Sequence, residues 1–360
     1  MLIKKKLRKK YLSLNYQKWA KNKYRGHRRF TQNRWRISPI VRNLTEINNK
    51  YQFLLNCRSW VQKMEKYMVL SKKNLGVLVE RFLKEFQVYG PTEKNGIIAF
   101  EKISNWSELR LDVAGVPLLP PKKIFFPPEE VLFTFKIRNN NDVEIGDPLD
   151  KIKEEKRVLI GIRPCDVHGL TLLDKVFISE IVDPYYVTRR KNTIIICITC
   201  NNPTEYCFCN FTKSGPSIKE GFDLLLTDIG QFFLVEIGSE KGKDIINSNS
   251  DLFQEATEND LIKRDQKIRE VEEKLSRNQL TGANELYQKL IRVFNDELWN
   301  EYGRKCVACG KCNFACPTCH CFDVYDVMEL TLKEGKRVRK WDACHFLSFT
   351  RVAGGEIFRK

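Results

Sequence analysis

The sequence predicts an α+β protein in which a mixed α/β region is followed by a helical, cysteine-rich region. Two apolar runs, at 157–162 and 193–199, flank a helical stretch at 168–180. This strand–helix–strand order is typical of an α/β unit. Residues 258–300 have helical periodicity with charged outer positions. Seven of the thirteen cysteines follow residue 300, so the last sixth of the chain is rich in potential metal ligands.

The net charge of +17 is confined to one end of the chain. Residues 1–63 contain 18 Lys and Arg but one acidic residue, Glu46, so the remainder is neutral. Aromatic residues lie between the basic ones, a pattern that can grip phosphates and stack on bases. The alternatives are a disordered tail or an untranslated upstream extension, and we favour these. We therefore expect a basic arm at 1–63 that is disordered or not translated, and do not expect nucleic acid as a partner.

The composition and the number of cysteines indicate the cellular compartment. Hydrophobic residues make up 42% of the chain, enough for a sizeable core. The longest apolar run, 194–198, is far shorter than the about 20 residues of a membrane span, so no membrane is expected. No apolar stretch of a signal peptide follows the first basic residues. Thirteen cysteines in a reducing cytoplasm indicate metal binding rather than disulfides.

We expect an α/β domain over 64–255. It opens with a helix that Ser71 can cap, with apolar residues from Leu75 to Phe86 on one face and a stop at Gly90-Pro91. Short strands and loops follow over 92–136, including a proline-rich segment at 119–128 that can pack on a neighbouring surface or on a partner. Two further strands are expected at 222–227 and 232–237. The domain over 256–360 begins with helices and holds the main cysteine motif.

That motif is C-x2-C-x2-C-x3-C-P, formed by Cys306, Cys309, Cys312, Cys316 and Pro317. It is the bacterial ferredoxin spacing for a 4Fe-4S cluster, whereas zinc generally uses two separated cysteine pairs. In two-cluster ferredoxins the fourth cysteine of such a run binds the other cluster, which leaves a second destination open for Cys316. Three more cysteines follow as additional or substitute ligands, or as buried thiols: Cys319, Cys321 and Cys344.

A second cysteine group lies upstream. Cys165 follows the first strand of the α/β unit, and Cys200 follows the next strand, with Cys207 and Cys209 shortly after it. Adjacent strand ends can bring these four together around a second 4Fe-4S cluster, with zinc or plain thiols as the alternatives. Cys197 lies among isoleucines and is expected in the core.

Several long stretches resemble a known family. They are PPKKIFFPPEEVLFTF (120–135), GIRPCDVHGLTLLDKVF (161–177), CITCNNPTEYCFCN (197–210), CVACGKCNFACPTCHCFDVYD (306–326) and RKWDACHF with RVAGG (339–355). In order over roughly 70–360, they resemble the beta subunit of soluble sulfhydrogenases, nickel–iron hydrogenases that also reduce sulfur, and a related component of anaerobic sulfite reductase. The resemblance implies several 4Fe-4S clusters, an α-helical ferredoxin-like C-terminal domain, and cluster ligation by the upstream four cysteines.

Two departures from that family lead to a further expectation. The family pattern continues past RVAGG to another ferredoxin-type cysteine run, whereas this sequence ends at Lys360, and the basic arm matches nothing in the family. We therefore expect an incomplete C-terminal domain, lacking ligands of one cluster, and a split or misassembled reading frame.

The function that the resemblance implies is electron transfer. An iron–sulfur subunit of an anaerobic redox complex would pass single electrons between a flavin/NAD(P)-binding subunit and a hydrogenase or sulfite reductase subunit. The chain shows no Gly-rich dinucleotide loop after a strand and no evident catalytic constellation, so we do not expect it to be catalytic alone. The alternative from another class is a zinc-stabilised binding module whose basic arm contacts nucleic acid.

Overall fold

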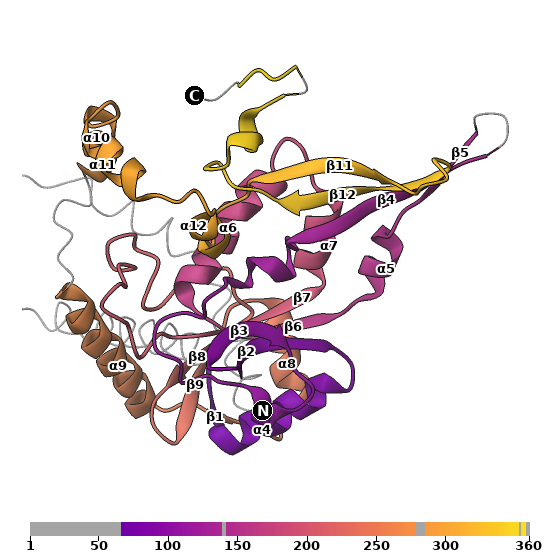
Figure 1. Ribbon diagram of the computed structural model, residues 1–360. Helices are drawn as coiled ribbons and strands as arrows, with labels where there is room; N and C mark the ends of the chain where they lie inside the picture. The colour runs from indigo at the N-terminus through magenta and orange to yellow at the C-terminus, as the bar shows by residue number, and fades with distance from the viewer. Residues whose placement is uncertain (1–65, 139–141, 278–284, 353, 358–360) are drawn as a thin grey trace, which may run out of the picture. The chain divides into compact units, whose positions relative to one another are not determined.

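The computed structural model describes residues 66–138, 142–277, 285–352 and 354–357, and the basic arm at 1–63 lies outside them. Eight strands of the described chain form one mixed sheet (Figure 1). They are β1 (Tyr67–Ser71), β2 (Gln87–Lys94), β3 (Ile97–Lys102), β6 (Arg157–Ile162), β7 (Thr193–Ile198), β8 (Leu224–Asp228), β9 (Phe232–Ile237) and β10 (Phe253–Glu255).

The strand order of this sheet is β10-β1-β9-β8-β7-β6-β2-β3. The four central strands β8, β7, β6 and β2 are parallel to one another, and the outer pairings are antiparallel. Every residue of β6 is buried, as expected for a central strand with both faces covered. The carboxyl ends of the parallel strands therefore meet at one edge of the sheet.

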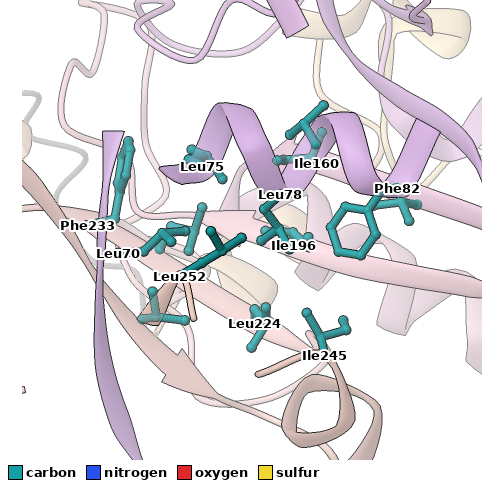
Figure 2. Close-up of a cluster of buried hydrophobic side chains, with 14 of the residues drawn as sticks. Leu70, Leu75, Leu78, Phe82, Ile160, Ile196, Leu224, Phe233, Ile245 and Leu252 are labelled. Carbon is teal, nitrogen blue, oxygen red and sulfur yellow. The ribbon is translucent and has the colours of Figure 1, made fainter. Parts of the chain in front are cut away.

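Helices bury both faces of the sheet. On one face lie α4 (Lys72–Leu83) and α8 (Glu240–Ser248), whose leucines and isoleucines pack on alternate residues such as Ile160 and Ile196 (Figure 2). On the other face lie α6 (Pro164–Phe177) and α7 (Pro184–Lys191), which pack on the intervening residues Leu159 and Ile195. The period of two along the strands explains this division.

A second sheet joins distant parts of the chain. Its order is β11-β12-β4-β5, formed by β4 (Glu129–Ile137), β5 (Val143–Gly146), β11 (Phe322–Met328) and β12 (Glu334–Trp341). Figure 1 shows β4 alongside the yellow β11–β12 hairpin. Glu130 on β4 joins this sheet to α7, because it accepts hydrogen bonds from the buried Arg189 of α7 and Arg339 of β12.

The remaining helices are short or lie late in the chain. They are α5 (Leu149–Glu154), α9 (Glu258–Ser276), α10 (Leu286–Arg292), α11 (Leu298–Lys305) and α12 (Lys311–Ala315), with one-turn 3-10 helices η1 (Trp106–Glu108), η2 (Pro121–Ile124) and η4 (Leu347–Thr350). Within the described ranges, no helix is long and apolar enough to cross a membrane.

The α+β class predicted from the sequence is confirmed, and so is the cap at Ser71, whose Oγ accepts from the amide of Asn74 at 3.1 Å. The end predicted for the first helix, at Gly90-Pro91, was wrong. The first helix ends at Leu83, and Gly90-Pro91 lies inside β2. Pro91 is tolerated there because the ladder to β6 covers only the start of β2, from Gln87 to Tyr89.

Candidate metal centre

The four upstream cysteines lie around one cavity. Cys165 is the second residue of α6, just past β6, and Cys200 lies two residues past β7. Because these parallel strands are neighbours, their carboxyl ends bring both residues to the same edge. The loop that follows carries Cys207 and Cys209 back to this edge. All four line a cavity of about 560 Å³, so the structure brings together the set that the sequence predicts.

Backbone and side-chain contacts shape this loop around its sulfur atoms. The amide of Thr204 donates to Sγ of Cys207 at 3.2 Å, and the Thr204 hydroxyl is 3.3 Å from the same sulfur. Gly215 leaves room for Cys209, because a Cβ at that glycine would be 2.9 Å from the Cys209 sulfur. Hydrogen bonds to sulfur are the contacts by which proteins tune thiolate ligands.

Burial favours the neutral thiol at three of these positions, Cys165, Cys200 and Cys209, because it raises the pKa of each. Burial raises the pKa of Cys165, and the negative charges of Asp166 and the other three cysteines raise it further. Burial, then Cys200 and Cys207, raises the pKa of Cys209 to about 11. A bound metal centre would instead lower the pKa of these thiols, because cysteines that coordinate a metal are deprotonated. Cys197 is fully buried in the core cluster beside α6 and does not line the cavity.

The first three cysteines of the C-terminal run lie on a loop and a short helix. Cys306 directly follows α11, Cys309 lies in the loop, and Cys312 is in α12; all three are exposed. On either side of Cys309, Ala308 and Gly310 have left-handed φ values of 52° and 69°. Turns of this kind direct successive N–H groups into a concavity that suits anions, including iron–sulfur clusters.

The later cysteines come together through the β11–β12 hairpin. Its strands pair Phe322 with Trp341, and the amide of Asp342 donates to the carbonyl of Cys321 at 3.0 Å, which brings Cys344 back to the start of the hairpin. Burial raises the pKa of Cys321 to about 11, and Cys319 and Cys344 add to this effect.

Asn313 links the later cysteines to α12. Its side-chain amide donates to the sulfur of Cys344 at 3.2 Å and to that of Cys319 at 3.6 Å. The role of Asn313 is not evident from the sequence, because a single Asn between two cysteines carries no signal without the hairpin.

Lys122 is a second residue that the sequence did not reveal. Its side chain is buried, and its ammonium donates to the carbonyls of Asn313 at 3.2 Å and Cys319 at 3.0 Å. Burial lowers the pKa of Lys122, while Cys319, Cys316 and Cys321 oppose that shift. The proline-rich segment predicted to pack on a neighbouring surface therefore packs on the C-terminal cysteine segment.

Cys316 connects the two cysteine groups. Together with Pro317 and Thr318 it lines the same cavity as the four upstream cysteines. The approach is close, because a Cβ at Gly169 of α6 would lie 2.9 Å from the Cβ of Pro317. Figure 1 shows α12 beside α6 at this point.

The arrangement of the thiols does not match a preformed zinc site. In the part of the chain that the structure describes, no three Cys, His, Asp or Glu side chains are grouped closely enough to hold a single metal ion. A tetrahedral zinc site with four thiolates would place its sulfur atoms about 3.8 Å apart. A four-iron cube is larger and needs its thiolates further apart.

Two comparisons agree with this chemistry. Residues 305–360 match the family described as "4Fe-4S dicluster domain". The chain is 36% identical over 296 residues to the sulfhydrogenase 2 subunit beta of Pyrococcus furiosus, an alignment that covers 82% of this chain and 84% of that protein. No solved structure matches the chain significantly. The chain is thus an iron–sulfur electron-transfer subunit with 4Fe-4S clusters as its cofactors, and it belongs to the sulfhydrogenase beta subunit family.

Proposed function

We propose that this chain relays single electrons between an upstream 4Fe-4S cluster and clusters on its C-terminal segment. The upstream cluster would be held by Cys165, Cys200, Cys207 and Cys209. The observation that carries this proposal is the cavity of about 560 Å³, which all four upstream cysteines share with Cys316 of the C-terminal run.

Two destinations are open for Cys316. It can complete the set with Cys306, Cys309 and Cys312, or it can serve a different cluster, as the fourth cysteine does in two-cluster ferredoxins. We propose the second, in which the cysteines here called the turn group bind that cluster. The turn group is Cys316, Cys319, Cys321 and Cys344.

Two contacts support the turn group. The buried Lys122 donates to the carbonyl of Cys319 at 3.0 Å, and Cys319, Cys316 and Cys321 act to raise its pKa. The Asn313 amide bridges the sulfurs of Cys319 and Cys344. Cys306, Cys309 and Cys312 would then hold three irons of a separate cube in the loop around Gly310.

Serine variants test the ligand sets. Cys209→Ser, Cys309→Ser and Cys316→Ser, each in the whole chain isolated without oxygen, should remove three different signals from the EPR spectrum of the reduced protein. Each should also lower iron and acid-labile sulfide by up to one cube. Loss of the same signal in the Cys309 and Cys316 variants would place Cys316 with the first three cysteines instead. An unchanged spectrum in the Cys209 variant would remove the upstream cluster from the proposal.

The partners follow from the same proposal. The relative from Pyrococcus furiosus is by its name a subunit of a sulfhydrogenase. We infer that this chain acts in the cytoplasm, is not catalytic alone, and connects a flavin/NAD(P)-binding subunit with a hydrogenase or sulfite- or sulfur-reducing subunit. Affinity isolation of the tagged chain from its native cells should recover such subunits in the soluble fraction. Recovery of the chain alone, with its clusters intact, would contradict this.

A further inference from the structure

Lys122 reaches the C-terminal cysteines from a segment that is anchored in the other half of the fold. It lies in η2, directly after Pro120 and Pro121, and its side chain is 2% exposed. Three and four residues further along, Phe125 and Phe126 are fully buried in the core cluster beside α6. The backbone of Lys122 is therefore fixed by the α/β core, while its ammonium lies against the C-terminal segment.

The partners of this ammonium are neutral. Its two hydrogen bonds go to the carbonyls of Asn313 and Cys319, and it lies 4.4 Å from the ring centroid of Trp341. Within the described ranges, no carboxylate forms an ion pair with Lys122. The adjacent Lys123 differs in this respect, because it pairs with Glu101 at 2.7 Å.

A buried ammonium without a counter-ion is strongly unfavourable, so negative charge is expected close by. The hydrogen bond to the Cys319 carbonyl at 3.0 Å places the ammonium on the cysteine segment, and Cys319, Cys316 and Cys321 are the groups that raise the pKa of Lys122 against the effect of burial. These are three of the four cysteines of the turn group. A cube bound by four thiolates is an anion, and it gains one further negative charge when it takes up an electron.

We propose that Lys122 is the buried counter-ion of the cluster held by the turn group and raises the reduction potential of that cluster. This inference rests on the proposed ligand set. A fixed cation stabilises the reduced cube more than the oxidised one, because the reduced cube carries more negative charge. In a buried site, where the effective dielectric is low, this difference is large. Lys122 is thus a positioning residue for electron transfer, since it acts on the cluster and not on a substrate.

The test is an EPR-monitored redox titration of the whole chain, reduced stepwise with dithionite, with iron and acid-labile sulfide measured on the same samples. Lys122→Met removes the charge and keeps most of the volume. It should shift the equilibrium of one cluster at least tenfold toward the oxidised form, which is about 59 mV for a one-electron couple. Lys122→Arg keeps the charge, so its reduction potential should stay close to that of the wild type. Lys123→Met, the matched control, should leave every potential unchanged.

The potentials and the iron content of the variants show whether Lys122 acts as the counter-ion of the cluster. An intact cluster with a wild-type potential in Lys122→Met overturns the proposal, as does an equal shift in Lys123→Met. Loss of one cluster in Lys122→Met with retention in Lys122→Arg supports it, because the charge is then needed to hold the anion. Loss in both variants overturns it, because side-chain shape then matters and not charge. Wild-type chain without iron would instead refute the proposed function itself.

Discussion

Gly169 of α6 and Pro317 of the C-terminal cysteine run are in such close contact that a Cβ on the glycine would lie 2.9 Å from the Cβ of the proline. No real pair of Cβ atoms approaches this closely, so any larger side chain at 169 must displace Pro317 or α6. This contact lies beside the cavity that the upstream cysteines share with Cys316. Gly169 therefore sets how near the two cysteine groups can come.

Gly169→Ala should lower the free energy of unfolding by about 1–3 kcal/mol, the usual cost of overpacking. Gly303→Ala in α11 is the matched control, because nothing lies within 4 Å of its would-be Cβ. That variant should instead gain about 0.5–1 kcal/mol from the higher helix propensity of Ala. Urea denaturation without oxygen measures both, and equal effects of the two substitutions would show that the contact with Pro317 is unimportant.

Glu130→Gln should destabilise the protein strongly. Both carboxylate oxygens of Glu130 are used, one by Arg339 at 2.9 Å and the other by Arg189 at 2.8 Å, and all three side chains are buried. Removing the negative charge leaves two buried guanidinium groups less well paired, and breaking a buried pair costs about 3–5 kcal/mol.

The control for Glu130 is Asp326→Asn, which breaks an exposed pair with Arg337 on the same strand as Arg339. An exposed pair of this kind is worth at most about 1 kcal/mol. The difference between the two variants is measured by urea denaturation. A Glu130 variant no less stable than the Asp326 variant would mean that the second sheet is not held by this network.

Tyr186→Phe should remove part of the pH dependence of stability. The Tyr186 hydroxyl donates to Asp174 at 2.7 Å, and burial, then Asp174, raises the pKa of Tyr186 above its ordinary value of 10.0. An unfolded chain would lose that proton from about pH 10, whereas the folded chain keeps it to higher pH. Tyr186 therefore contributes stability that is fully present below pH 10 and is lost as the pH rises above it.

The phenylalanine variant should be less stable at pH 8 by about 1.5–3 kcal/mol, because it lacks a hydrogen bond to a charged group. Its stability should also fall less steeply above pH 10 than that of the wild type. Tyr206→Phe, at a residue that is 81% exposed, serves as the control and should change neither value. If the stability of the wild type and of the Tyr186 variant fell equally steeply above pH 10, the folded chain would not be holding the Tyr186 proton to higher pH.

Cys197→Ala should leave iron content unchanged. Cys197 is fully buried on β7 and packs in the core cluster beside α6, away from the cavity lined by the other upstream cysteines. The variant should retain every EPR signal and lose a modest amount of stability through the small void that it leaves. Loss of a cluster signal would instead make Cys197 a ligand.

The α/β part of the fold could be predicted from the sequence because its signals are local. The runs that became β6 and β7 are short and apolar, and adjacent parallel strands place Cys165 and Cys200 at one edge by geometry alone. Prediction failed where a local signal conflicted with its surroundings. Gly90-Pro91 is a helix stop on local grounds but lies in β2, where an incomplete ladder tolerates the proline.

The C-terminal half of the site depends on long-range pairing, which a single sequence does not show. All residues of β11 are exposed, so this strand carries no burial pattern, and the pairing of β12 with β4 spans roughly 200 residues. Cys344 comes shortly after β12 in the chain, so its contact with Asn313 cannot be found without that pairing. Lys122 was missed for a different reason, because lysine is a residue type that is normally exposed. The ligand roles of the cysteines stay predictions.

Whether the chain carries several 4Fe-4S clusters is decided by the iron and acid-labile sulfide content of the whole chain isolated without oxygen, taken with its EPR spectrum before and after reduction. We predict a brown protein with equal amounts of iron and sulfide, more than one cube per chain, and signals of more than one cluster on reduction. A pale protein without acid-labile sulfide, or one with stoichiometric zinc in place of iron, would contradict the account.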